Sequence, residues 1–198
     1  NNNINLNAGN SGTAARLLSA TLINSPKYIK VTGDNSLKKR DMKRIVDPLK
    51  EFGAIFKIKK NKLPLSIKGS KFIRPINYME LKGSAQCKSA VMLAALFAPG
   101  TTRLKCIKSR DHTENFFKNV IKVPIKIKKN KQFDFIEIDG KKNFKGFTYH
   151  IPGDVSSAAF FIVLTLLNKN SSILIKNINI NPSRIGMIKI LNLMGSKI

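Results

Sequence analysis

Short runs of apolar residues recur along the chain at nearly constant spacing. Residues 14–23, 90–98 and 159–167 are three such runs, rich in alanine and larger aliphatic residues and free of proline. A serine, one of the residue types that commonly cap helix N-termini, lies three to six positions before each run. The pattern therefore predicts three buried helices. The serines that open them are Ser11, Ser84 and Ser156, at spacings of 73 and 72 positions.

The segments after each predicted helix repeat as well. A polar turn leads into alternating polar and apolar residues, which predict a strand, and a second, amphipathic helix follows. We expect the strands at residues 28–32, 102–107 and 172–178, and the second helices at residues 41–52, 113–120 and 184–194. Two short strands complete each of the first two copies, at residues 55–59 with 65–68 and at residues 125–128 with 133–138.

The repeating unit is thus helix–strand–helix–strand–strand, an α/β architecture in two full copies and a third that stops at residue 198. The chain starts almost inside the first predicted helix, without the strand that we expect before it. Natural domains seldom begin and end inside a unit, because apolar faces and strand edges would be left uncovered. We therefore expect this chain to be a piece of a longer protein.

Composition adds a strong positive charge. The 198 residues carry 36 Lys and Arg against 11 Asp and Glu, a formal net charge of +25. Such a charge indicates an anionic partner, with nucleic acid as one class. However, the basic residues are mostly lysines spread along the whole chain, often alternating with apolar residues as on a solvated strand face. We favour solvated faces and keep RNA binding as an alternative.

Other function classes are disfavoured. There is neither an apolar run of membrane-spanning length nor a secretory signal pattern, so we expect a cytoplasmic protein. The two cysteines, Cys87 and Cys106, and the two histidines, His112 and His150, lack the spacing of a zinc site. We expect reduced, mostly buried thiols, no metal and no cofactor.

The loop GNSGTAAR, residues 9–16, is a candidate anion site. A helix start presents free N–H groups and a partial positive charge. Gly12 would let a ligand approach the backbone, and Arg16 would offer a planar guanidinium fork. The spacing is equally compatible with a packing role for Gly12 and a surface charge at Arg16. Arg40 is a further candidate, although its spacing alone favours an ordinary surface charge.

Five motifs, in order along the chain, resemble those of the EPSP synthase (3-phosphoshikimate 1-carboxyvinyltransferase) family. They are GNSGTAAR at 9–16, GDNSLKKRDMKRIVDPLKEFGA at 33–54, SAQCKSAVMLAAL at 84–96, SRDHTE at 109–114 and IPGDVSSAAFF at 151–161. The resemblance covers essentially the whole chain. It implies an inside-out α/β barrel of repeated units, the enolpyruvyl transferase fold, incomplete here. Residues 1–150 would be part of the first domain and residues 151–198 the truncated start of the second.

The family transfers the enolpyruvyl group of phosphoenolpyruvate to the 5-hydroxyl of shikimate 3-phosphate and releases phosphate, in the shikimate pathway to chorismate and the aromatic amino acids. The resemblance implies two sets of binding residues. Phosphoenolpyruvate would be bound by Gly12, Arg40 and Gln86. Shikimate 3-phosphate would be bound by Ser84, Ala85, Gln86 and Arg110, with Ala85 contributing only its backbone. Corner or hinge roles are implied for Asp34 and Asp154.

Two departures from the family pattern bear on the site. The family usually has Arg-Pro where this chain has Arg40-Asp41, and an acid there would weaken the positive potential unless Asp41 caps the next helix. Some glyphosate-tolerant members carry Ala at the position of Gly12, which implies that Gly12 leaves room for that inhibitor.

The resemblance places the family's acid–base residues outside this chain. Its lysine–serine pair would precede residue 1, and its general-base aspartate and lysine–glutamate pair would follow residue 198. No catalytic residue is therefore assigned here, and we expect the isolated chain to be inactive. We expect the full-length protein to be a monomer that binds small anionic substrates, without a membrane or nucleic-acid partner.

Three alternatives remain open. The related transferase acting on UDP-N-acetylglucosamine uses a loop cysteine as its acid, whereas Cys87 and Cys106 lie in helix and strand contexts. RNA 3′-phosphate cyclases contain related repeats, and the net charge would suit such an RNA-binding protein. A non-catalytic relative is the third.

Overall fold

The computed structural model describes residues 4–140 and 145–198. These residues form two compact units, which are described separately: residues 1–109 with 113–145, and residues 110–112 with 146–198. The chain of the first unit passes twice through the same series of elements. These are β1 (Ile4–Asn7), α1 (Gly12–Thr21), β2 (Ile29–Thr32), α2 (Lys43–Glu51), β3 (Ile55–Lys59) and β4 (Lys62–Lys68), then β5 (Asn77–Glu80), α3 (Ala85–Ala95), β6 (Gly100–Ile107), α4 (His112–Asn119), β7 (Ile125–Lys129) and β8 (Phe133–Gly140).

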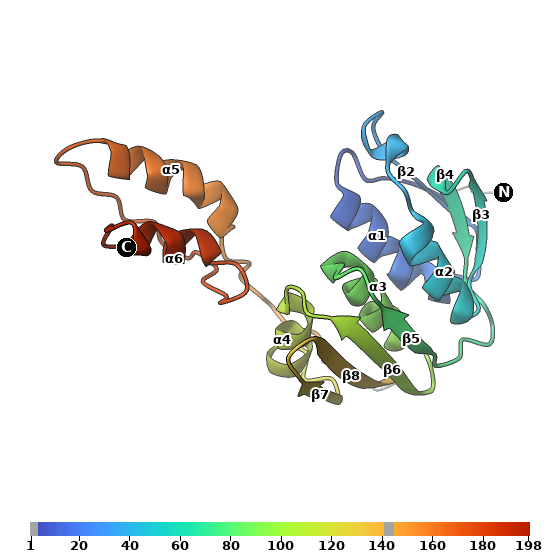
Figure 1. Cartoon of the computed structure of the whole chain (residues 1–198). Coiled ribbons are helices and arrows are strands. Elements are labelled where there is room, and N and C mark those ends of the chain that lie inside the picture. The colour runs from blue at the N-terminus through green and yellow to red at the C-terminus, as the bar shows by residue number, and fades with distance from the viewer. Residues whose placement is uncertain (1–3, 141–144) are drawn as a thin grey trace. The chain divides into compact units, whose positions relative to one another are not determined.

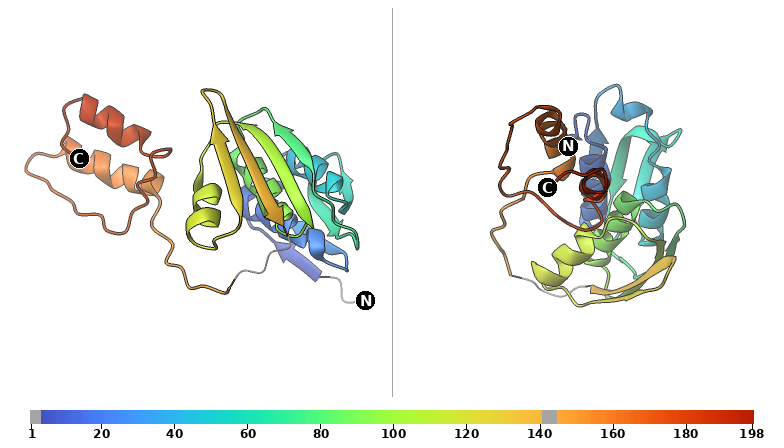
Figure 2. Two further views of the ribbon diagram at one scale, coloured as in Figure 1. Left: turned by 90° about the horizontal axis from the view of Figure 1, so that it is seen from below. Right: turned by 60° about the vertical axis from the view of Figure 1, so that its left-hand side comes forward.

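The two passes give two four-stranded sheets of identical topology. Their strand orders are β1-β2-β4-β3 and β5-β6-β8-β7, and in each the first two strands are parallel and the other pairs antiparallel. Helices α1 and α3 pack against each other, on the inner side of the sheets in Figure 1. The left view of Figure 2 shows α3 behind the second sheet. Helices inside and strands outside are the arrangement that the repeats and the family resemblance predict.

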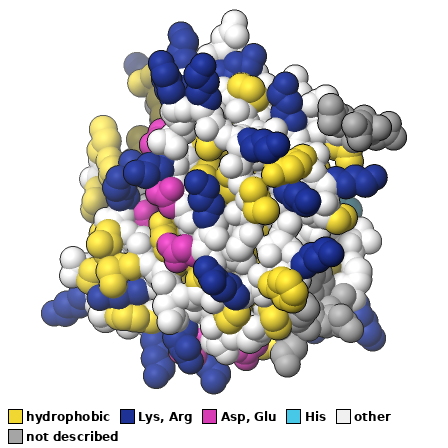
Figure 3. Space-filling model, turned by 90° about the vertical axis from the view of Figure 1, so that its right-hand side faces the viewer, with side chains coloured by type: hydrophobic (Ala, Val, Ile, Leu, Met, Phe, Trp, Pro, Cys, Tyr) yellow, Lys and Arg dark blue, Asp and Glu magenta, His cyan; other side chains and the backbone are white. Residues whose placement is uncertain are grey.

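Small side chains allow the helices to lie at the centre. Eight of the eleven residues of α3 are buried, mostly Ala, Val and Met. In α1 the buried residues form a stripe of Gly12, Ala15, Ser19 and Ala20. In the strands, lysines alternate with apolar residues and face outward. In β3, for example, Lys57 and Lys59 are exposed, whereas Phe56 and Ile58 are partly buried. On the face that Figure 3 shows, Lys and Arg side chains are dispersed rather than gathered into one patch, as expected of solvated strand faces.

The prediction that no strand precedes the first helix is wrong. β1 lies there and pairs with β2 in parallel, and β5 occupies the same place in the second copy. The unit is therefore strand–helix–strand–helix–strand–strand. Both strands have only four residues and contain asparagine, which is depleted in strands, so their pattern is weak.

The second unit contains α5 (Val155–Leu167) and α6 (Gly186–Leu193). The strand predicted at residues 172–178 is absent among the described residues, where only an isolated bridge joins Gly153 to Ile178. The prediction that α5 is buried is also wrong, because only Val155 and Ala158 are buried while Phe160 is 80% exposed. An alternating apolar sequence forms a strand only with a neighbouring strand, and an apolar helix is buried only by a packing partner.

The predicted state of the cysteines is confirmed. Cys87 and Cys106 are free and buried. Burial raises the pKa of both thiols, that of Cys106 to about 12, which keeps them protonated and unreactive. Within the described ranges no group of three or more His, Cys, Asp or Glu could hold a metal ion, and no helix is long and apolar enough to span a bilayer.

Candidate functional site

The loop before α1 is fixed by hydrogen bonds that leave the helix start open. Ser11 caps the helix, since its Oγ accepts the N–H of Ala14 at 3.1 Å. The Asn7 Oδ1 accepts the N–H of Gly9 at 3.0 Å, and the Gly9 carbonyl accepts the N–H of Asp34 at 2.8 Å. Gly9 has a φ of +54°, which this turn requires. The first-turn N–H groups of α1 that Ser11 does not bind remain available to an anion.

Two arginines flank Gly12. A Cβ atom on Gly12 would lie 3.1 Å from Arg16 Nη1 and 3.2 Å from Arg40 Nη1. The absent side chain therefore leaves a bare backbone position beside two guanidinium groups at a helix N-terminus. Arg40 is steadied by a long bond of 3.5 Å from its Nη2 to Asn10 Oδ1. Two forked cations and a helix dipole at one point are suited to phosphate or carboxylate.

Gln86 joins this cluster from the second copy. The Arg16 Nη1 donates to Gln86 Oε1, and Gln86 Nε2 donates to Thr13 Oγ1 at 2.6 Å. Thr13 and Gln86 are 73 positions apart and occupy equivalent places in the two copies. The structure thus brings Gly12, Arg40 and Gln86 together around Arg16, whose guanidinium bonds to Gln86 rather than standing alone on the surface.

The start of α3 lies beside that of α1 and has the same design. Ser84 caps it, since its Oγ accepts the N–H of Cys87 at 3.3 Å, and Ala85 is the first helical residue. The backbone N–H of Ser84 donates to Glu80 Oε2 at 3.0 Å. Ser84, Ala85 and Gln86 therefore form one helix turn at the seam between the copies.

The structure explains the acid that follows Arg40. The Asp41 Oδ1 accepts the N–H of Lys43, the first residue of α2, at 2.7 Å. The carboxylate of Asp41 therefore binds the N-terminus of α2. This is the condition under which an acid beside Arg40 need not weaken the positive potential of the site.

Asp34 has the expected corner role. Its Oδ1 accepts the N–H of Leu37 at 2.7 Å, and its Oδ2 accepts the Asn10 side chain at 2.6 Å. The hydrogen bond from Leu37, helped by that from Asn10 and by the nearby charge of Arg40, lowers the pKa of Asp34. The aspartate therefore stays ionised and holds Asn10 beside Arg40.

Arg110 belongs to the second unit. There it lines a hollow of about 310 Å³ together with His112, Asp154 and Arg184. Asp154 caps α5 by accepting the N–H of Ser156 at 3.2 Å and pairs with Arg184 Nη2 at 2.9 Å. The bond from Ser156, and then that from Arg184, lower the pKa of Asp154. Arg184 was not predicted as a site residue from the sequence, although Arg184 precedes the second helix of its copy as Arg40 does in the first.

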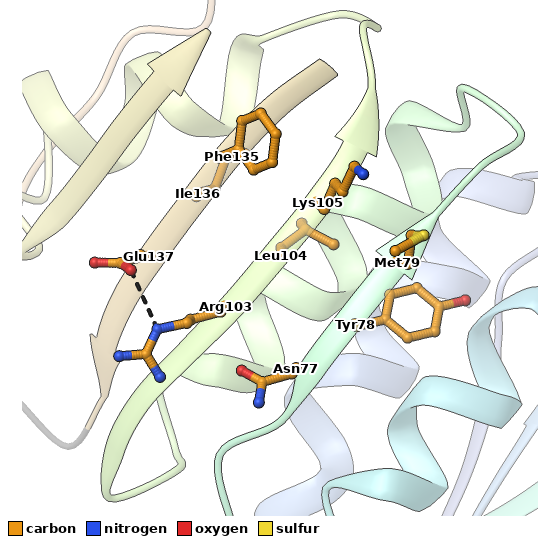
Figure 4. A pocket seen from close by; sticks show the side chains of 9 residues that line it. All are labelled: Asn77, Tyr78, Met79, Arg103, Leu104, Lys105, Phe135, Ile136 and Glu137. Atoms are coloured by element: carbon orange, nitrogen blue, oxygen red, sulfur yellow. Dashed lines mark hydrogen bonds and ion pairs between the residues drawn. The ribbon is translucent and has the colours of Figure 1, made fainter. Parts of the chain in front are cut away.

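A larger hollow lies on the outer face of the second sheet, between β5, β6 and β8 (Figure 4). Its lining includes the exposed Met79 and Phe135 and a surface ion pair of Arg103 Nε with Glu137 Oε1 at 3.1 Å. None of the residues implied by the family resemblance lines it. We therefore place the candidate site at the helix starts.

Comparison with known proteins identifies the family. The family model described as EPSP synthase (3-phosphoshikimate 1-carboxyvinyltransferase) matches residues 1–198. A 3-phosphoshikimate 1-carboxyvinyltransferase of Petrotoga mobilis is 45% identical over 98% of this chain and 44% of its own length, and one of Thermotoga sp. (strain RQ2) is 40% identical over 96% and 44%. The chain thus spans less than half of these relatives.

Solved structures match as well. An EPSP synthase from Acinetobacter baumannii superposes with a TM-score of 0.82 at 36% identity, covering 97% of this chain and 43% of that one. This likeness confirms the predicted α/β fold class. The matches do not favour the alternatives of a UDP-N-acetylglucosamine transferase or an RNA-binding protein.

Proposed function

We propose that this chain, which belongs to the EPSP synthase family, forms part of an enzyme that transfers the enolpyruvyl group of phosphoenolpyruvate to shikimate 3-phosphate. The observation that carries the proposal is the convergence of Arg16 and Arg40 at the bare backbone of Gly12, beside the capped start of α3. Both substrates are anions, and each would meet a helix N-terminus.

The family resemblance implies the roles of the individual residues, and the contacts around Gly12 and Ser84 support them. Arg40 and the backbone at Gly12 would hold the anionic groups of phosphoenolpyruvate, and Gln86 would reach both substrates. Ser84 and the first amides of α3 would hold shikimate 3-phosphate. For Arg110, which lies in the second unit, binding of the same substrate stays a prediction from the resemblance. Preorganised cations and N–H groups lower the barrier by placing the two substrates together and by stabilising charge that develops in the transition state.

The proposal leaves the proton transfers to residues outside this chain. A cytoplasmic location, a monomeric state and a domain boundary near residue 151 stay predictions. We expect the protein expressed from its complete coding sequence to release phosphate only when both substrates are present, and the isolated 198 residues to show no turnover. Phosphate release assays on the two proteins test this. An inactive complete protein, or turnover by the isolated chain, would contradict it.

Gly12→Ala in the complete protein should raise KM for phosphoenolpyruvate about three- to tenfold, because the added methyl would press on Arg16 and Arg40. Both contacts are to the ends of flexible side chains, so the fold should survive. If Gly12 leaves room for glyphosate, the same variant should bind that inhibitor more weakly.

Gly146→Ala is the matched control, since a Cβ there meets nothing within 4 Å. Steady-state kinetics and inhibition assays on both variants provide the measurement. Tight glyphosate binding by the Gly12→Ala variant would count against the proposed role.

A further inference from the structure

Glu80 is a buried carboxylate at the end of β5, where the loop to α3 begins. It is 4% exposed. Its Oε1 accepts the N–H of Lys82 at 3.1 Å, and its Oε2 accepts the N–H of Ser84 at 3.0 Å. Between these two residues Gly83 has a φ of +63°, a conformation that glycine adopts readily. The loop is thus folded around a single charged side chain.

These bonds decide which groups of Ser84 remain for a ligand. Its N–H is taken by Glu80, and its Oγ accepts the N–H of Cys87. A hydroxyl is both donor and acceptor, so the O–H of Ser84 is still able to donate. The N–H groups of Ala85 and Gln86 lie in the first turn of α3, where amides have no acceptor within the helix. The orientation of these donors depends on how the backbone at Ser84 is held.

The first copy connects the equivalent strand and helix without a buried charge, through a turn whose left-handed residue, Gly9, lies one position earlier in the repeat than Gly83. Asn7 is the equivalent of Glu80, 73 positions earlier, and among the described residues its neutral side chain accepts the N–H of Gly9 alone. There the N–H of Ser11 donates to a backbone carbonyl, that of Ala8, at 2.9 Å. Burying a carboxylate is costly, and Asn7 shows that a strand-to-helix connection of this length can form without one.

We propose that Glu80 is a positioning residue for shikimate 3-phosphate, which holds Ser84 so that its O–H and the first amides of α3 face the phosphate. The inference rests on the proposed function. The direction of the effect of Glu80 on the binding of shikimate 3-phosphate can be tested. The negative charge of Glu80 opposes the binding of an anion, whereas its hydrogen bonds favour binding by fixing the donors.

Glu80→Gln separates these two effects, because it removes the charge while keeping the size of the side chain. Its single carbonyl oxygen replaces two carboxylate acceptors, and its NH2 group faces one backbone N–H. In the complete protein we expect KM for shikimate 3-phosphate to rise about tenfold, with kcat and KM for phosphoenolpyruvate nearly unchanged.

Asp134→Asn is the control, a second buried carboxylate, 3% exposed, that lies in β8 and is separated from Glu80 by Cys106 of β6 in the sheet register. It should leave both KM values unchanged. A fall in KM for shikimate 3-phosphate in Glu80→Gln would show that charge outweighs positioning and would overturn the inference. An equal change in both KM values, following a lower Tm, would indicate a purely structural role and would also overturn it.

Hydrogen exchange tests the loop independently of activity. In the complete protein the Ser84 amide should exchange at least about tenfold faster in Glu80→Gln than in the wild type. Unchanged protection would overturn the inference. An inactive wild type would contradict the proposed function, while the exchange result would still decide whether Glu80 holds Ser84. If Glu80→Gln does not fold, Glu80→Asp, one methylene shorter, takes its place in both measurements with the same expected directions.

Discussion

Arg40→Ala in the complete protein is expected to lower kcat/KM for phosphoenolpyruvate by about 10²–10³-fold, the usual cost of removing one preorganised donor to a reacting anion. Arg40 reaches the Gly12 backbone from a different element than Arg16, and Arg16 is already committed to Gln86 and to the Asp41 carbonyl. Arg16 is therefore poorly placed to replace it. Steady-state kinetics at saturating shikimate 3-phosphate provide the measurement.

Two further variants complete this test. Arg40→Lys should recover only part of the activity, because an ammonium lacks the bidentate fork. Lys39→Ala removes the neighbouring exposed cation and should leave kcat/KM nearly unchanged. If Arg40→Ala stays within fivefold of the wild type, or if Lys39→Ala loses as much activity, the positive charge of the site is diffuse and the assignment of Arg40 is wrong.

Lys88→Met should destabilise the complete protein by about 3–5 kcal/mol, the usual cost of leaving one member of a buried ion pair alone. Lys88 on α3 is fully buried, and its Nζ lies 2.5 Å from Oε1 of Glu114 on α4, itself 2% exposed. The other oxygen, Glu114 Oε2, is buried and has no hydrogen-bond partner. Without Lys88, the buried carboxylate of Glu114 would lose the cation that stabilises its charge.

Thermal unfolding provides the measurement, as a clear fall in Tm. The control is the double variant Lys88→Met/Glu114→Leu, which removes both charges and should recover most of the lost Tm, since apolar replacement of a whole buried pair is often neutral. An unchanged Tm in Lys88→Met, or a double variant less stable than the single one, would contradict the expectation.

Periodicity predicted the elements whose signal is local. The apolar run at 90–98 lies largely in α3, and the alternating lysines at 55–59 form β3. Both were predictable because the order of apolar and polar residues within the segment itself indicates a helix or a strand. β1 and β5 were missed because they are short and their stability comes from pairing with β2 and β6. The segment 172–178 shows the converse, a good alternating pattern with only a bridge at Ile178.

The residues of the candidate site were named from the family resemblance, whereas their geometry could not be predicted from the sequence. Local spacing left Gly12 and Arg16 undecided between binding and packing, and it favoured an ordinary surface charge at Arg40. Their meeting point depends on how the helices of two repeats cross, which no local pattern encodes. The 73-residue spacing was the available signal, since it makes Thr13 and Gln86 equivalent, and these two residues are the ones that touch.

That contact shows that the candidate site is built from equivalent positions of two repeats, and that these positions carry different residues. Because Thr13 bonds to its own counterpart Gln86, the two copies present equivalent helix starts side by side. A perfectly symmetric frame would treat two ligands alike. The two copies differ at Gly12 against Ala85, Arg16 against Ser89 and Asn7 against Glu80. Under the proposed function, these differences would give each helix start its own selectivity, so that a duplicated scaffold could distinguish two unlike anions.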